Sequence, residues 1–399
     1  PAVAAPKGML ADPMTNLTTA FTVAIASLIL AASASAGPRL YAPDYSDDLV
    51  YAYEAAGDGA LAPLPGSPFA LLAGPDPKPV SNVSGLAFAP HGDRAASGYL
   101  FKGGVAAADA TVDGTLVAAG TPVTTPSVTN IAVSPDGRFV YAGTRDFMGV
   151  SAVGVLGYEL GAGGSLSPLP GSPYGGAEEI RDVAITPDGR FLYASIFGNV
   201  RRFAINPDGS LAMLGDTPAT GADYLTTSPD SRLLFVGITS GVGHSVRAFV
   251  IGPDGDLTAA GTVETGGSAL HFFAVSPDGS HLYVPDINTD AVQTVAVGGD
   301  GSLTVLGSVA IEEVHAIAVS PDGRFAYLQN TDGIHVASIG ADGNLSLTGR
   351  STPMGLGEVA RPVFQPQPAP VARFEAKAGA PKSASRFDAS ASKRAATFT

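Results

Sequence analysis

Residues 134–142 of the chain are Ser-Pro-Asp-Gly-Arg-Phe-Val-Tyr-Ala, and this short stretch decides the fold. Proline fixes its own φ angle, aspartate accepts hydrogen bonds from nearby backbone amides, and glycine tolerates a positive φ. The first four residues therefore predict a tight turn. Because apolar segments lie on both sides of it, at 131–133 and 139–142, the whole stretch predicts a β-hairpin.

The same turn recurs along the chain, at intervals of 42 to 52 residues. Its six full copies and one shortened copy are centred on Pro90, Pro135, Pro187, Pro229, Pro277, Pro321 and Pro366. A second motif, glycine followed by any residue and then leucine, recurs at a similar spacing in seven places, as at 209–211, where a third strand is expected to turn into a fourth. Seven copies of both motifs predict seven four-stranded units.

The ends of the repeated body indicate how these units are arranged. The body begins with a second-strand pattern at 39–42 and finishes with a lone first-strand pattern at 362–364. One blade is therefore expected to be completed by strands from both ends of the body, which removes exposed sheet edges. The sequence predicts an all-β protein, a seven-bladed β-propeller with four-stranded blades. A two-sheet sandwich is the structural alternative.

Composition and charge exclude several classes of function. The 399 residues hold 50 Gly, 32 Pro and no Cys, and the net charge is −14. Without cysteine the chain has no disulfide, thiolate zinc site or cysteine nucleophile. The acidic balance argues against nucleic acid as a partner, because a phosphate backbone requires clustered Lys and Arg. No Gly-x-Ser-x-Gly elbow, phosphate loop or dinucleotide fingerprint is present.

The two ends of the chain differ in composition from the body. Residues 20–36 form an apolar run that closes on Ala-Ser-Ala, so 1–36 is predicted to be a leader with a signal-peptide-like segment at 14–36. An uncleaved membrane anchor is the second interpretation and a buried core helix the third. After the body, 367–370 is predicted to be a Pro-rich linker. Residues 371–399 follow it and carry six basic and two acidic side chains.

Two resemblances follow from these motifs. The SPDGRFxYA hairpins and the repeated Pro-Leu-Pro-Gly-Ser-Pro at 63–68 and 168–173 resemble the YVTN or lactonase-like seven-bladed propellers, which include the propeller type of 6-phosphogluconolactonase. This resemblance covers 37–366 and implies a lactonase-type hydrolase. Segment 371–399 resembles the opening strands of a PKD-type immunoglobulin-like module and lacks that module's later Trp-Asp-Phe-Gly-Asp-Gly signature.

The best local match to the lactonase-like family lies between residues 269 and 290. His271 stands where the family has the second histidine of a His-x-His pair, and Asp286 and Asp290 match an acidic pair. Ala269 replaces the first histidine, and Asn288 replaces a glycine. The chain therefore keeps only half of the motif with which the resemblance associates hydrolysis.

Repeat register identifies which side chains should meet at the channel mouth. Residues six and five positions before each turn proline are expected to lie at the mouth, and they contain the titratable side chains. The predicted catalytic residues are His271, His315, Arg181 and Asp223. Further predicted ligand-binding residues, from the same positions and from loops after the second strands, are Asp182, Arg361, Arg145, Asp146, Asp286, Asn288 and Asp290. A histidine there would activate water while an arginine holds a developing oxyanion, as opening of a ring ester needs.

Three functional hypotheses remain open at this stage. The first is a secreted or cell-surface scaffold, a monomer that binds an extracellular protein, glycan or small molecule at its mouth. The alternative is a lactone hydrolase that uses His271 and His315, and the third is a purely structural spacer. No cofactor or metal site is predicted, although acidic loops would suit a divalent cation such as calcium. Residues 37–370 hold 15 basic and 33 acidic side chains, a net charge of −18, which disfavours anionic sugar phosphates as substrates.

Overall fold

The computed structural model describes residues 37–367 without 45–48, 72–81, 102, 148, 150, 240–243, 266–271, 287–288 and 355–359, and it adds 375–377 and 386–388. The predicted leader at 1–36 lies outside the described residues, as does most of the predicted PKD-like module. From that module the structure describes one two-stranded hairpin, β30 (Glu375–Lys377) with β31 (Arg386–Asp388). No helix in the described ranges is long and apolar enough to cross a bilayer.

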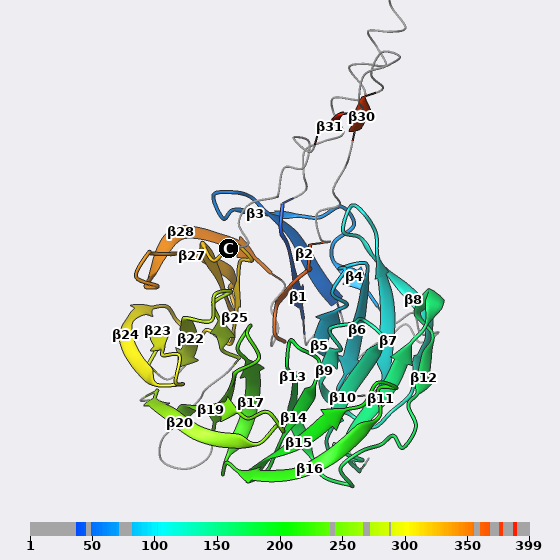
Figure 1. Cartoon of the computed structure of the whole chain (residues 1–399). Coiled ribbons are helices and arrows are strands. Elements are labelled where there is room, and N and C mark those ends of the chain that lie inside the picture. The colour runs from blue at the N-terminus through cyan, green and yellow to red at the C-terminus, as the bar shows by residue number, and fades with distance from the viewer. Residues whose placement is uncertain are drawn as a thin grey trace, which may run out of the picture. The chain divides into compact units, whose positions relative to one another are not determined.

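Seven antiparallel sheets surround a central axis, so the predicted seven-bladed propeller of four-stranded blades is confirmed (Figure 1). The strands of blades 2, 3 and 4, from the axis outward, are β5 (Val83–Phe88), β6 (Arg94–Tyr99), β7 (Val105–Ala110) and β8 (Leu116–Val123); β9 (Val128–Val133), β10 (Phe139–Thr144), β11 (Val155–Leu160) and β12 (Leu166–Pro168); and β13 (Ile180–Ile185), β14 (Phe191–Ile196), β15 (Asn199–Ile205) and β16 (Leu211–Pro218). A 3₁₀ turn, η1 (Ala162–Gly164), joins β11 to β12.

Blades 5, 6 and 7 follow the same order. Their strands are β17 (Ala222–Thr227), β18 (Leu233–Ile238), β19 (Ser245–Ile251) and β20 (Leu257–Glu264); β21 (Ala274–Val275), β22 (His281–Asp286), β23 (Ala291–Val297) and β24 (Leu303–Ala310); and β25 (Ala316–Val319), β26 (Phe325–Asn330), β27 (Gly333–Ile339) and β28 (Leu345–Pro353). In each blade the second strand is almost fully buried, while the outermost strand is largely exposed.

Blade 1 is completed by both ends of the body, as predicted. Its inner strand is β29 (Val363–Phe364), which pairs with β1 (Arg39–Pro43), and β2 (Leu49–Ala55) and β3 (Leu61–Pro63) continue outward. A further short strand, β4 (Phe69–Ala70), also pairs with β2. The register places Leu40 opposite Phe364.

The repeated turn is held by its own side chains. In blade 3, the Ser134 hydroxyl donates to Asp136 Oδ1 at 2.5 Å and accepts the Phe139 backbone amide at 2.9 Å. The Arg138 amide donates to Asp136 Oδ1 at 3.1 Å, and Gly137 has a φ of 73°. This glycine therefore occupies the left-handed region, which the turn requires.

A tyrosine in the second strand connects neighbouring blades. The Tyr141 hydroxyl donates to the Gly209 carbonyl of the next blade at 2.7 Å, and Tyr41, Tyr193 and Tyr283 bond equivalent glycines at 2.6 to 3.2 Å. Burial raises the pKa of Tyr283 to about 12, so this hydroxyl keeps its proton and remains a donor. In blade 5 the same position is Phe235, which has no hydroxyl.

Replacing Tyr141 with phenylalanine is therefore expected to lower the free energy of unfolding by about 1 kcal/mol, because one buried hydrogen bond is lost while the ring remains. Urea unfolding followed by circular dichroism would measure the change. The reciprocal Phe235→Tyr variant is the control, since it adds a hydroxyl where blade 5 lacks one. An unchanged midpoint for Tyr141→Phe would show that the bond between blades contributes nothing.

Candidate functional site

Five side chains from five blades contact one another across the axis. Each stands five residues before its turn proline, the repeat position that the sequence predicts for the channel mouth. They are Asn130, Asp182, Tyr224, Phe272 and Arg361, and we call them the axial plug. These residues lie at one level because they occupy the same repeat position, in or just before the inner strand of each blade.

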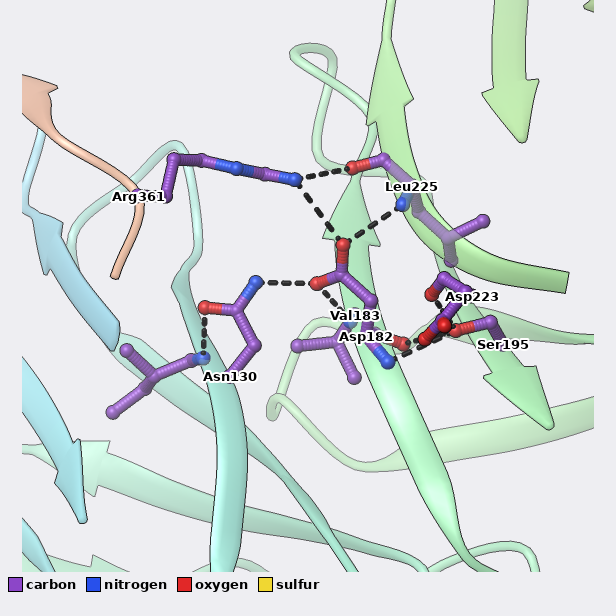
Figure 2. Close-up of polar contacts among 8 residues, drawn as sticks. Asn130, Asp182, Val183, Ser195, Asp223, Leu225 and Arg361 are labelled. Atoms are coloured by element: carbon purple, nitrogen blue, oxygen red, sulfur yellow. Dashed lines mark hydrogen bonds and ion pairs between the residues drawn. The ribbon is translucent and has the colours of Figure 1, made fainter. Parts of the chain in front are cut away.

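Asp182 is fully buried in the plug. Figure 2 shows the hydrogen bonds that meet at its carboxylate. Its Oδ1 accepts the Asn130 side-chain amide and the Val183 backbone amide, the latter at 2.8 Å. Its Oδ2 accepts the Leu225 backbone amide at 2.8 Å and Arg361 Nη2 at 3.2 Å. The carboxylate therefore ties the inner strands of blades 3, 4 and 5 to the segment that closes blade 1.

Arg361 and two aromatic rings complete the plug. The Arg361 guanidinium also donates to the Leu225 carbonyl at 3.2 Å, and its Cζ lies 5.0 Å from the centre of the Phe272 ring. The Phe272 ring meets Tyr224 edge to face with centroids 4.8 Å apart. A cation over an aromatic face is an attractive arrangement, so the arginine is held in place by charge, hydrogen bonds and stacking.

Burial affects the protonation of two plug residues. It raises the pKa of the Asp182 carboxyl, against the opposing effect of Arg361, the Leu225 amide, Asn130 and the Val183 amide. It also raises the pKa of the Tyr224 hydroxyl, with a smaller contribution from Asp223 in the same direction. The floor of the mouth is thus a weakly hydrated surface, where electrostatic interactions are stronger than in water.

Arg181, Asp223 and His315 each come one residue before the plug position of their blade, Arg181 in β13, Asp223 in β17 and His315 directly before β25. Arg181 Nη1 lies 3.8 Å from Asp223 Oδ2, and the same oxygen accepts the Thr239 hydroxyl at 2.8 Å. His315 is half-buried, and its carbonyl accepts the Phe272 backbone amide at 3.2 Å. The predicted catalytic residues Arg181 and Asp223 are therefore paired, and His315 adjoins the plug through its backbone.

The remaining predicted residues are more dispersed. Asp146 is exposed and accepts the Ala152 backbone amide within its own loop, and Arg145 lies 5.8 Å from the Phe147 ring centre. Asp286 is buried, whereas Asp290 is exposed and accepts the Glu313 amide at 3.3 Å. The predicted residues His271 and Asn288 lie outside the described residues.

The structure differs from the sequence-based expectation at Asp182. The sequence places this residue on a hydrated rim, yet the structure buries it completely, because four hydrogen-bond donors enclose its carboxylate. Three plug members, Asn130, Tyr224 and Phe272, are absent from the predicted site. The sequence feature that could have identified them is their repeat position, five residues before the turn proline, which they share with Asp182 and Arg361.

No metal centre is formed by the part of the chain that the structure describes, where no group of three or more histidine, aspartate or glutamate side chains is arranged to hold an ion. Binding of a divalent cation such as calcium by the acidic loops stays an alternative drawn from the sequence alone.

Comparison with known proteins finds that part of this chain is similar to a family of lactonases. Residues 198–316 match the lactonase family of seven-bladed β-propellers. The matched stretch covers the third and fourth strands of blade 4, blade 5, blade 6 and the start of blade 7, and it contains His271, Asp223 and His315.

Two curated relatives are named 6-phosphogluconolactonase. The protein of Enterobacter sp. (strain 638) is 25% identical over 161 residues, which are 38% of this chain and 48% of the relative. That of Pectobacterium carotovorum subsp. carotovorum is 28% identical over 181 residues, which are 43% and 53% of the two chains. The chain thus spans about half the length of the curated relatives it matches.

Solved structures share the fold over a larger part of the chain. The periplasmic gluconolactonase of Pseudomonas aeruginosa superposes with a TM-score of 0.66 at 21% identity, covering 82% of this chain and 99% of that one. A protein from Lactobacillus plantarum gives a TM-score of 0.66 at 20% identity, with the same coverage. At this level of identity, the likeness establishes the propeller architecture.

Proposed function

We propose that the protein is a lactone hydrolase whose active site is the channel mouth above the axial plug. The observation that carries the proposal is that Arg181, Asp223 and His315 share one repeat position, directly before the plug position that Arg361 occupies, and that Arg181 and Asp223 form an ion pair there. The match of residues 198–316 to the lactonase family supports the same reaction. These findings favour hydrolysis over the alternative of a ligand-binding scaffold.

The reaction requires a base, a water molecule and a group that stabilises negative charge. A neutral histidine, His271 or His315, takes a proton from water, whose oxygen attacks the lactone carbonyl carbon. The carbonyl oxygen becomes an oxyanion, and the Arg181 guanidinium stabilises it. The ring C–O bond then breaks, the protonated histidine returns the proton to the leaving oxygen, and the product is a hydroxy acid.

Asp223 and Asp182 would act as positioning residues in this scheme. Asp223 holds the Arg181 guanidinium at 3.8 Å and is itself fixed by the Thr239 hydroxyl. Asp182 holds Arg361 against Phe272. Since residues 37–370 have a net charge of −18, uncharged lactones are the proposed substrates.

A pH-stat assay with glucono-1,5-lactone and δ-valerolactone tests the proposal. We expect hydrolysis above the solvent rate, and a loss of kcat of about 10²-fold or more in whichever of His271→Ala and His315→Ala removes the base. His91→Ala is the matched control, because His91 is an exposed histidine in the blade 2 turn. Its activity should equal that of the unchanged protein.

Two results of this assay would contradict the proposal. If neither lactone is hydrolysed faster than in buffer, or if both histidine variants keep full activity with an intact circular dichroism spectrum, the mouth is not a lactonase site. A thermal-shift panel of sugars and peptides would then address the scaffold hypothesis.

A further inference from the structure

Arginine side chains connect neighbouring blades on the face that carries the repeated turns. Each guanidinium donates to a backbone carbonyl in the turn between the third and fourth strands of the next blade, which we call the outer turn. Arg232 Nη2, for example, donates to the Gly299 carbonyl at 3.1 Å. Six of the seven junctions between blades carry such an arginine, namely Arg39, Arg94, Arg138, Arg190, Arg232 and Arg350.

The junction between blades 6 and 7 has no such arginine in the described part of the chain. In blades 1 to 5 the arginine comes three or two residues before the second-strand tyrosine or its equivalent, and in blade 6 these positions hold Ser280 and His281. The outer turn of blade 7 presents the Ala341 carbonyl where Pro207 and Gly299 accept an arginine in other blades. Ala341 is exposed, so its carbonyl is accessible to a donor from another molecule.

A cavity of about 390 Å³, open to solvent, lies at this junction. Its size is within the range of small-molecule pockets. Asp278 and His281 line it from blade 6, and Asp322, Ile339 and Ala341 line it from blade 7. The exposed carbonyl and two carboxylates therefore border the same space.

The equivalent cavity between blades 3 and 4 shows how a guanidinium binds at such a place. That cavity has a volume of about 400 Å³, and Asp136 and Pro207 line it. The Arg138 guanidinium donates to the Pro207 carbonyl at 3.5 Å and lies 4.0 Å from the Asp136 carboxylate. Blade 6 retains the corresponding carboxylate, Asp278, but has no guanidinium beside it.

Asp278 carries a negative charge at this junction. Partial burial acts to raise the pKa of its carboxyl, but hydrogen bonds from Ser276 and Ser280, with a smaller effect of His281, outweigh burial and lower that pKa. The second carboxylate, Asp322, lies 4.0 Å from the exposed Arg324 guanidinium, and such a pair is weak. No lysine or arginine lines the cavity, so its field favours a cation.

We propose that the cavity between blades 6 and 7 binds a small guanidinium compound, whose planar head takes the place that an arginine of this chain fills at the other junctions. The head donates to the Ala341 carbonyl beside Asp278, and a short carbon chain lies in the cavity along Ile339. The cavity is at the repeated turns, at the opposite end of the inner strands from the mouth. The proposal does not depend on hydrolysis there.

The chemistry of the site favours a guanidinium over other ions. Asp278 and Asp322 repel an anion, and no group of three or more metal-ligating side chains is arranged to hold a metal ion in the described ranges. A guanidinium is planar, carries five donors and is less strongly hydrated than an ammonium, so it can reach a carbonyl and a carboxylate together. All six side chains that bond an outer turn in this way are arginines.

Agmatine is a suitable probe, because it joins a guanidinium to a four-carbon chain. Isothermal titration into the full chain should give a dissociation constant of about 1–10 mM. Ser280→Arg is expected to weaken binding about tenfold or more, because the new guanidinium would occupy the ligand's place. Blades 3, 4 and 5 have arginine at this repeat position, so the turn accommodates the larger side chain.

Val112→Arg is the matched control. It adds the same charge in an outer turn at a residue that is 97% exposed, far along the ring from blades 6 and 7, and it should bind agmatine as the unchanged protein does. Putrescine has the same carbon chain with an ammonium in place of the guanidinium, and it should bind about tenfold more weakly than agmatine.

A second measurement does not depend on Ser280. In crystals soaked with agmatine, a guanidinium nitrogen should lie about 3 Å from the Ala341 carbonyl oxygen. In Arg138→Ser, a second agmatine should lie between blades 3 and 4, at the Pro207 carbonyl. Equal weakening by Ser280→Arg and Val112→Arg, equal binding of putrescine and agmatine, no binding to the unchanged protein, or a ligand located elsewhere would overturn the proposal.

Discussion

Replacing Asp182 with alanine is expected to lower the free energy of unfolding by about 3–5 kcal/mol. The change removes the acceptor of four donors at once, two backbone amides, the Asn130 amide and the Arg361 guanidinium. It also leaves the Arg361 charge without its partner beside an aromatic ring. Guanidinium chloride unfolding, with the slope checked for two-state behaviour, would measure the loss.

Asp223→Ala is the matched control for this variant. Asp223 also faces an arginine from the neighbouring blade, but the pair is separated by 3.8 Å and is less buried, so we expect a loss of about 1 kcal/mol or less. If Asp182→Ala were no more destabilising than Asp223→Ala, the buried carboxylate would not hold the inner strands together. Asp182→Asn should fall between the two, because the amide keeps one acceptor oxygen.

The blade count was predictable because it depends on local chemistry. Proline, aspartate and glycine fix the conformation of each turn within four residues, as the Ser134 and Asp136 hydrogen bonds show. The number of repeats then gives the number of blades. The second-strand pattern at 39–42 and the first-strand pattern at 362–364 indicate that both ends of the body complete one blade. None of these steps requires knowledge of contacts between distant blades.

Repeat register also predicted which residues share a level of the axis, including Asp182 and Arg361. It did not predict that they touch, because residues 182 and 361 are 179 positions apart and their distance depends on the diameter of the ring. The aromatic members Tyr224 and Phe272 were missed for a different reason. The prediction from the sequence was limited to charged and histidine side chains, whereas the Phe272 ring stacks on Arg361 and the Tyr224 ring packs edge to face against Phe272.

The second large loss in the free energy of unfolding is expected where blade 1 closes the ring of blades, at Gln365. Only two residues of β29 pair with β1. The side chain of Gln365, the next residue, makes further hydrogen bonds at this junction. Its amide nitrogen donates to the Gly92 carbonyl of blade 2 at 2.6 Å, and its oxygen accepts from Arg39 at 3.3 Å and from the Tyr41 hydroxyl at 3.4 Å. One buried side chain thus joins both ends of the body to the next blade.

Gln365→Ala is therefore expected to lower the free energy of unfolding by about 2–3 kcal/mol, since it leaves the buried Gly92 carbonyl without its donor and removes an acceptor of the Arg39 guanidinium. Hydrogen exchange should show the same change locally, as faster exchange of the β1 amides. Gln367→Ala, two residues further along the same segment and partly exposed, is the matched control and should change neither quantity. Equal exchange rates in the two variants would mean that the short β29 strand closes the ring without help from Gln365.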